Sequence, residues 1–229
     1  YLVMHKIFLG LLSIALFSPA PVRAESKSFV PRTISALGCM KLKECTEEVY
    51  SVKVTEDLNV FGDIDLADAE AEEINALLAA LTKVNVDVYI ADTRYFPRGM
   101  RAVYYTDNNT VYLNGTATGI PVSLLKSLRH EAWHTAQDCM AGTIDNTFIA
   151  VIFNDDQIPE RYRRSAELRY GTNPFLAKAV PWEQGAIYAG ATPNLTVKAL
   201  EACGAGEMWN AYEPTPMTRE WLVDNGYIL

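Results

Sequence analysis

Residues 121–142 read PVSLLKSLRHEAWHTAQDCMAG, and this stretch decides how the chain is expected to fold. Its apolar residues recur at the spacing of one face of a helix. They form a single stripe of Leu124, Leu125, Leu128, Ala132, Ala136 and Cys139. Pro121 suits the first turn of a helix, and Gly142 suits the position just after a helix ends. The sequence therefore predicts a long amphipathic helix here, with its apolar stripe packed on a core.

The middle of this predicted helix carries HEAWH at positions 130–134, which is an H-E-x-x-H pattern. His130 and His134 lie on the same helix face, so both can direct a ring nitrogen at one Zn²⁺. Glu131 then points to where a metal-bound water would lie. The alternative is a solvated helix face on which the two His bind no metal and the Glu forms an ion pair or interacts with the helix dipole. The chain has three His, and His5 lies in an expected leader, so both remaining His have ligand spacing, which favours a metal site.

The first residues have the pattern of a secretory signal peptide. Met4 is a plausible start, Lys6 gives a basic beginning, and residues 7–17 are apolar. A small-x-small cleavage pattern ends at Ala24. The apolar run is shorter than the roughly 20 residues that span a bilayer. We therefore expect residues 1–24 to be a leader (the signal peptide being about 4–24) and the mature chain to be secreted, or periplasmic or lumenal, with no membrane span.

The mature chain is expected to be strongly acidic. Loss of Lys6 and Arg23 leaves 18 of the 20 basic residues against 28 acidic ones, a net charge of −10. With no basic cluster in the sequence, this charge argues against nucleic acid and anionic membranes as partners. Residues 25–229 suffice for one domain with its own core.

Four cysteines are present, at Cys39, Cys45, Cys139 and Cys203. An even count in an exported protein suggests two disulfides, for which three pairings exist. We expect Cys39 to pair locally with Cys45, and Cys139 to pair with Cys203. A cysteine-rich zinc site is the weaker alternative, because no C-x-x-C pair occurs.

Further elements are expected on both sides of the metal-binding helix. Before it come a strand at 49–55, a helix at 65–83, a strand at 84–91 and a hairpin of 101–106 with 110–113. After it come an apolar stretch at 144–153 and helices at 159–170, 181–189, 192–203 and 218–225.

This order of elements resembles the zincin fold. The resemblance implies an α+β domain, in which a small mixed or antiparallel sheet packs on the H-E-x-x-H helix and the C-terminal half is mostly helical. Residues 61–229 would form this catalytic domain, after an N-terminal arm at 25–60. In zincins the edge strand just before the active-site helix binds extended substrate by β-augmentation. Residues 110–114 have that position in this chain.

The third zinc ligand is less evident than the first two. Catalytic zinc usually takes three protein ligands and keeps one position open. No further His remains and the cysteines are expected to be oxidised, so a carboxylate is expected. The candidates are Asp145, Asp155, Asp156, Glu160, Glu167, Glu183 and Glu201. The segment WEQGAIY at 182–188 resembles the E-x-x-A pattern of gluzincins, which implies Glu183; Glu167 is the alternative. Glu183 also suits a helix N-terminus, without any metal.

The resemblance implies a zinc metalloendopeptidase that acts on protein or peptide substrates. Glu131 would activate the zinc-bound water as a base and then protonate the leaving amine. A transition-state donor is expected among Tyr212, Tyr188, Tyr170 and Arg169. Asp138 or Asn154 would orient a ligand His. Two alternatives stay open: a non-catalytic secreted zinc-binding structural or interaction protein, and a zinc hydrolase of a non-peptide amide.

Overall fold

The computed structural model describes residues 34–45, 47–117, 119–142, 149–212, 215–216, 223–224 and 226. The expected signal peptide lies outside the described residues, as does most of the expected helix at 218–225. Of the apolar stretch at 144–153, residues 149–153 are described, and they are irregular rather than helical.

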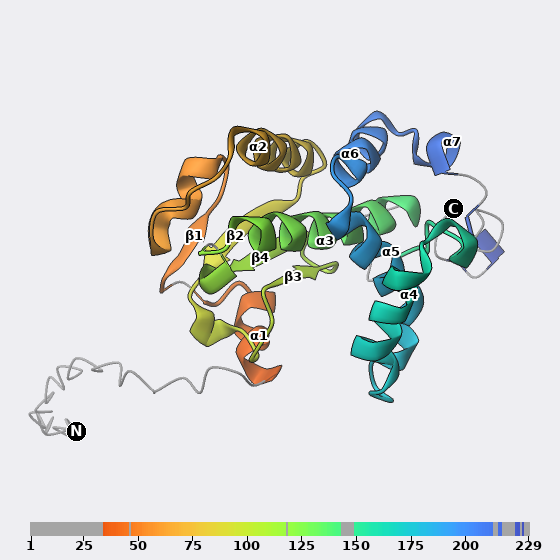
Figure 1. Cartoon of the computed structure of the whole chain (residues 1–229), viewed down its shortest axis with the longest axis horizontal. Coiled ribbons are helices and arrows are strands. Elements are labelled where there is room, and N and C mark those ends of the chain that lie inside the picture. The colour runs from red at the N-terminus through yellow and green to blue at the C-terminus, as the bar shows by residue number, and fades with distance from the viewer. Residues whose placement is uncertain are drawn as a thin grey trace, which may run out of the picture.

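The described residues form an α+β fold around a four-stranded mixed sheet, in the order β1-β2-β4-β3 (Figure 1). The strands are β1 (Val49–Ser51), β2 (Asp87–Ala91), β3 (Ala102–Tyr105) and β4 (Thr110–Asn114). β2 runs parallel to β4, whereas β1 is antiparallel to β2 and β3 is antiparallel to β4. The α+β class, the small mixed sheet and the helical C-terminal half agree with the prediction. β1 belongs to the segment expected to be an N-terminal arm, and it forms one edge of the sheet.

The expectation that residues 110–114 form an edge strand is wrong. β4 pairs on one side with β2 and on the other with β3, and all five of its residues are buried. The hairpin was expected, but β3 folds back on the outer side of β4 and becomes the edge. The chain order of the strands therefore differs from their spatial order, which local sequence patterns do not encode.

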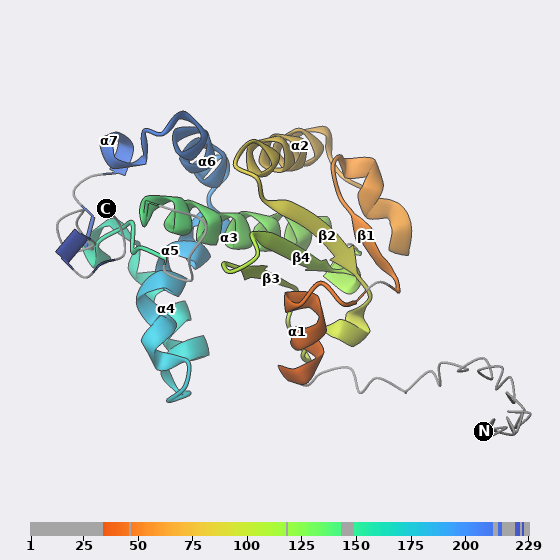
Figure 2. The ribbon, with the colours of Figure 1, turned by 180° about the vertical axis from the view of Figure 1, so that it is seen from behind.

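Two core clusters lie on opposite faces of the sheet. Successive residues of a strand point to opposite faces, so Val111 and Leu113 pack towards the helices while Tyr112 points the other way. The helical face is covered by α2 (Asp68–Lys83) and α3 (Pro121–Met140). The opposite face packs against Met40 of α1 (Ile34–Lys41), which Figure 2 shows on the side of the sheet away from α2.

Both central helices follow their predicted apolar stripes. In α2 these residues are buried: Ile74, Leu77, Leu78 and Leu81. In α3 the buried residues of the predicted stripe are Leu124, Leu125, Leu128, Ala132 and Ala136, while Cys139 is half-buried. Trp133 is fully buried and stacks on Phe153, with ring centroids 5.1 Å apart. The helix that carries the H-E-x-x-H pattern is thus held by the core on most of its circumference.

The C-terminal half supplies the remaining helices. They are α4 (Glu160–Ala166), a π-helical turn (Glu167–Gly171), α5 (Val180–Ala191), α6 (Leu195–Ala205) and α7 (Met208–Tyr212). α5 and α6 both pack against α3. α6 ends two residues later than expected, because Gly206 with φ +72° adopts the left-handed conformation that ends helices.

The four cysteines form the two predicted pairs. Cys139 of α3 pairs with Cys203 of α6, with Cα atoms 5.9 Å apart, and Cys39 pairs with Cys45 at 5.3 Å. Cys139 and Cys203 are 64 residues apart in the sequence. Closing a loop of that length lowers the conformational entropy of the unfolded chain and so stabilises the fold by roughly 4 kcal/mol. Within the described ranges, no helix has the length and apolar character needed to cross a bilayer.

Candidate metal centre

Three predicted side chains converge at the junction of α3 and α5. His130 and His134 project from one face of α3, with ring centroids 5.0 Å apart. Glu183, in the first turn of α5, lies opposite them. Its Oε2 is 3.2 Å from His130 Nε2, and its Oε1 is 3.6 Å from His134 Nε2. One ligand atom from each residue can be chosen so that all three lie within 4.8 Å of one another.

This arrangement fits a divalent metal ion. Ligand atoms around a tetrahedral Zn²⁺ stand about 2.0–2.1 Å from the ion, so they are separated from each other by roughly 3.4 Å. The distances from the Glu183 oxygens to His130 Nε2 and His134 Nε2, 3.2 and 3.6 Å, bracket this separation between ligand atoms. Glu183 Oε2 is also buried and makes no hydrogen bond of acceptable geometry with any described residue. A buried carboxylate is costly unless it has charged or hydrogen-bonding partners; the two imidazoles are such partners, and a bound cation would be a further one.

The other candidate carboxylates do not join this group. Glu167 is exposed, and its carboxylate folds back beside Gly171 in its own π-helical turn. The remaining described candidates are exposed: Asp155, Asp156, Glu160 and Glu201. Asp145 lies outside the described residues. Among the carboxylates that the structure describes, Glu183 is therefore the one that meets both imidazoles.

Two glycines allow α5 to approach α3 closely enough for this convergence. A Cβ on Gly185 would lie 3.1 Å from Trp133 Nε1, and a Cβ on Gly190 would lie 2.9 Å from the carbonyl oxygen of Lys126. Ala186, the small residue predicted to help this packing, is fully buried. Larger side chains at the two glycines would move α5 away from α3 and carry Glu183 with it.

Gln137 orients His134, a role that was expected of Asp138 or Asn154. Nδ1 of His134 lies 2.7 Å from Gln137 Oε1, and Gln137 Nε2 donates to the Trp182 carbonyl at 3.1 Å. Because an amide oxygen only accepts, Nδ1 carries the proton and Nε2 keeps its lone pair for a metal. The signal in the sequence was an amide three residues after His134, on the same helix face.

The residues first assigned this role have other contacts. Asp138 accepts a hydrogen bond from the Tyr104 hydroxyl at 2.8 Å, which links α3 to β3. The backbone N–H of Asn154 donates to Gln157 Oε1 at 2.8 Å and begins a 3₁₀ turn at Asp155–Gln157.

A buried ion pair fixes α3 next to the first ligand. Arg129 Nε donates to Glu73 Oε1 of α2 at 2.7 Å, and a second contact joins Arg129 Nη2 to Glu73 Oε2. The backbone N–H of Asn194, between α5 and α6, donates to Glu73 Oε1 at 2.8 Å. Glu73 thus ties together three segments around the site, and the sequence pattern gave no indication of this.

The charges of the site are strongly coupled. Burial by itself would raise the pKa of Glu183, but contacts with His130 and Tyr170 and the charge of both imidazoles lower it to about 2. Burial lowers the pKa of His130, but contact with Glu183 and the nearby charge of Glu131 outweigh this and raise it. Burial raises the pKa of Glu131, and the charges of His130 and His134 partly oppose this. Metal binding would therefore compete with a proton on His130.

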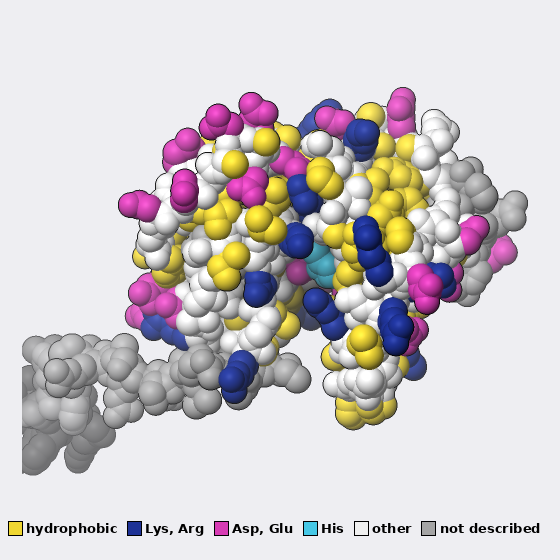
Figure 3. Space-filling model, in the orientation of Figure 1, with side chains coloured by type: hydrophobic (Ala, Val, Ile, Leu, Met, Phe, Trp, Pro, Cys, Tyr) yellow, Lys and Arg dark blue, Asp and Glu magenta, His cyan; other side chains and the backbone are white. Residues whose placement is uncertain are grey.

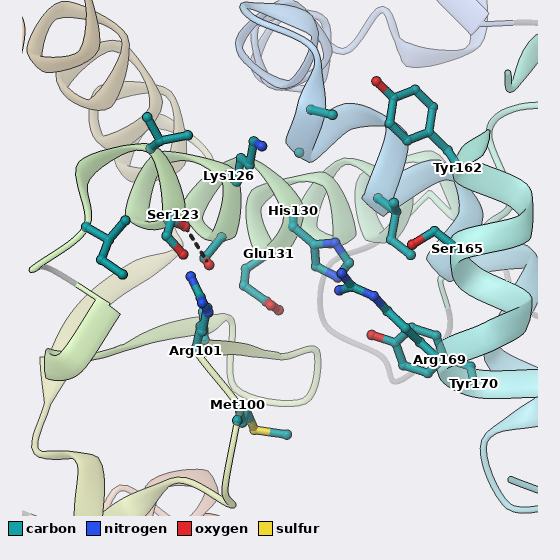
Figure 4. Close-up of a pocket in the computed structure, with 18 of the residues that line it drawn as sticks. Met100, Arg101, Ser123, Lys126, His130, Glu131, Tyr162, Ser165, Arg169 and Tyr170 are labelled. Atoms are coloured by element: carbon teal, nitrogen blue, oxygen red, sulfur yellow. Dashed lines mark hydrogen bonds between the residues drawn. The ribbon is translucent and has the colours of Figure 1, made fainter.

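The three-residue group borders an open cleft of about 1140 Å³ between α3 and α4. Figure 3 shows a His side chain at the bottom of this hollow. The Glu131 carboxylate points into the cleft (Figure 4), and the backbone of Tyr104 in β3 contributes a hydrogen bond that partly lowers its pKa. Tyr170 and Arg169 line the opposite wall, where the Tyr170 hydroxyl contacts Glu183.

The other two expected transition-state donors lie elsewhere. Tyr188 packs against Phe153 and Tyr162, with ring centroids 6.0 and 5.4 Å away. Tyr212 packs edge-on to the buried Trp133 at 6.3 Å. The structure thus brings Tyr170 and Arg169 into the cleft, and Tyr188 and Tyr212 into aromatic packing.

Comparisons with known proteins give no further guide. No protein-family model matches this sequence, and the curated proteins and solved structures yield no match either.

Proposed function

We propose that this chain is an exported zinc-dependent metallopeptidase of the zincin type, with a gluzincin-like ligand set. The observation that carries the proposal is the convergence of His130, His134 and Glu183 beside an open cleft into which Glu131 points. Two disulfides are compatible with an oxidising compartment outside the cytosol.

The donor set is the one expected of a catalytic site. His130, His134 and Glu183 would hold Zn²⁺ as three ligands, which leaves a position open, whereas structural zinc sites are usually closed by four ligands, often cysteines. All four cysteines of this chain are in disulfides. When bound, the ion would supply Lewis acidity that polarises a substrate carbonyl and makes a water molecule more acidic.

Glu131 is placed to move the proton. It is the residue after the first His ligand, it is not one of the three converging residues, and its carboxylate faces the cleft. In the proposed reaction it accepts a proton from the attacking water and passes it to the leaving amine nitrogen, so no covalent enzyme intermediate forms. Burial raises the pKa of Glu131, which favours proton uptake by this carboxylate.

The opposite wall supplies a donor for the developing oxyanion. The Tyr170 hydroxyl and the Arg169 guanidinium both line the cleft across from Glu131. Burial raises the pKa of Tyr170, so its hydroxyl stays protonated and can donate. We assign the stabilisation of the oxyanion to the Tyr170 hydroxyl, because a fixed donor in a partly desolvated site contributes strongly to such a step.

The edge strand β3 offers a binding track for an extended peptide. β3 has one described neighbour in the sheet, β4, and its other edge is unpaired among the described strands. Ala102 of β3 lines the cleft, and the Tyr104 backbone contacts Glu131. A peptide added to this edge would pass directly over the catalytic carboxylate. The substrate role first given to β4 thus moves to β3.

The test is hydrolysis of a mixed protein substrate by the purified, zinc-loaded protein. Cleavage should disappear with a chelator, return with added Zn²⁺, and be absent in the Glu131→Gln variant. Stoichiometric zinc without cleavage of any peptide or amide would favour the zinc-binding structural or interaction protein. Release of product from small amides but not from peptides would favour the non-peptide hydrolase.

A further inference from the structure

The cleft beside the metal-binding group is basic, although the chain is acidic. Its lining includes five of the chain's 20 Lys and Arg residues but, besides the proposed base Glu131, none of its other 27 Asp and Glu residues. The basic residues are Arg98, Arg101, Lys126, Arg161 and Arg169. They come from three separate stretches of the sequence, so their gathering in one cleft is not evident there. Figure 3 shows Lys and Arg side chains on both sides of the hollow that holds the His.

These five cations are available to a ligand. All five are exposed, and among the described residues none of them forms a salt bridge. The basic residues that do form described salt bridges are Lys41, Lys43, Arg94 and Arg129, and none of these lines the cleft. Arg161 donates to the neighbouring Tyr162 hydroxyl at 2.8 Å, which orients it without neutralising it. A group of like charges without counter-ions is destabilising unless something anionic binds there.

The cations flank the proposed scissile position on two sides. Arg101, just before the edge strand β3, and Lys126 of α3 stand on one side of Glu131, whereas Arg169 stands on the other (Figure 4). A peptide lying along β3 would therefore pass cations both before and after the bond opposite Glu131. The cations are therefore placed to contact substrate side chains on either side of the scissile bond, rather than the bond itself.

We propose that the cleft selects peptides with Asp or Glu side chains on both sides of the scissile bond. The cleavage step rests on the proposed function, whereas the binding preference rests on the charge of the cleft alone. A short acidic segment is favoured over a long polyanion, because the acidic surface outside the cleft would repel a polymer within a Debye length of roughly 10 Å at 0.1 M salt.

The test uses short peptides of equal length, acetylated and amidated at their ends, with a central bond flanked by Glu, Gln or Lys. Binding is measured by fluorescence anisotropy on the zinc-loaded Glu131→Gln variant, and kcat/KM on the zinc-loaded wild-type protein. Each exposed charge pair raises the binding affinity by roughly two- to fivefold. Several pairs together predict about tenfold tighter binding of the Glu peptide than of the Gln peptide. The preference should shrink as salt is raised.

Variants on the cleft wall test the assignment by residue. Arg101→Gln combined with Lys126→Gln should weaken binding of the Glu peptide by roughly two- to fivefold per charge and leave the Gln peptide unchanged. Arg101→Glu combined with Lys126→Glu should turn the preference towards the Lys peptide. The matched control is Arg164→Gln, which removes an exposed charge of α4 that does not line the cleft, and it should change nothing.

Each outcome separates this inference from the proposed function. Equal binding of the three peptides, or preference for Lys, overturns the inference even if all three are cleaved. Selective binding of the Glu peptide without any cleavage supports the inference and refutes the peptidase. Two further probes, the Glu peptide with a free C-terminal carboxylate and an anionic polysaccharide, are measured in the same assay. Binding that requires the free carboxylate, or tighter binding of the polysaccharide than of the Glu peptide, also overturns the inference.

Discussion

Replacement of Arg129 by Met should destabilise the fold strongly, because it leaves Glu73 charged and buried without its partner. The side chains of Arg129 and Glu73 are 8% and 9% exposed, and two nitrogen–oxygen contacts join them. Removal of one partner of such a pair costs about 3–5 kcal/mol. This is a large part of the roughly 5–15 kcal/mol by which a domain is normally stable.

The measurements are chemical and thermal denaturation of the wild-type protein, Arg129→Met, and Arg129→Met combined with Glu73→Leu. For a chain of this size the single variant should lower Tm by roughly 10 °C. The double variant should recover most of the loss, because apolar replacements of a buried pair are often nearly neutral. About 1 kcal/mol should remain lost, since the Asn194 N–H loses its acceptor. A loss below about 1 kcal/mol in the single variant, or no recovery in the double variant, would refute this account of the pair.

Three further predictions concern the metal centre. Glu131→Gln should abolish hydrolysis while metal analysis still finds about one zinc per chain, because a base is lost and the ligands remain; residual activity near wild type would exclude Glu131 as the base. Glu183→Ala should lose zinc after dialysis, whereas Glu167→Ala should keep it, and the reverse result would transfer the ligand role to Glu167. Gln137→Leu should weaken zinc affinity by roughly 10- to 100-fold in competition with a chromogenic chelator, since His134 loses the acceptor that fixes its tautomer. An unchanged affinity would show that Gln137 does not orient the ligand.

The elements that depend on residues close together in the sequence, such as α3 and the β3–β4 hairpin, could be predicted from the sequence. The helix from Pro121 to Met140 has an apolar stripe, a proline at its start and a glycine after its end, and each signal points to the same structure. The hairpin of β3 and β4 follows equally from alternating strands around a turn in which Asn109 adopts φ +52°. The E-x-x-A pattern indicated Glu183 as a ligand, and its carboxylate lies 3.2 and 3.6 Å from the Nε2 atoms of His130 and His134.

Features that depend on distant segments could not be predicted in this way. The interior position of β4 follows from its parallel pairing with β2, which is a choice between partners and not a property of either strand. The Glu73–Arg129 pair joins residues 56 positions apart. The basic cleft collects cations from the segment before β3, from α3, and from α4 with the π-helical turn after it, so the sequence alone does not show that they meet.

The cross-link between Cys139 and Cys203 has a consequence for a protein that is proposed to cut peptides. His130 and His134 precede Cys139 in the chain, and Glu183 lies between Cys139 and Cys203. A nick at any bond between the cysteines would therefore leave two fragments that stay covalently joined, with all three residues in one molecule. Self-digestion in this region would pass unnoticed on a non-reducing gel, and the fragments would separate only when a reductant is added. A preparation cut in this way could keep its metal and its activity, so an intact band is not required for an active molecule.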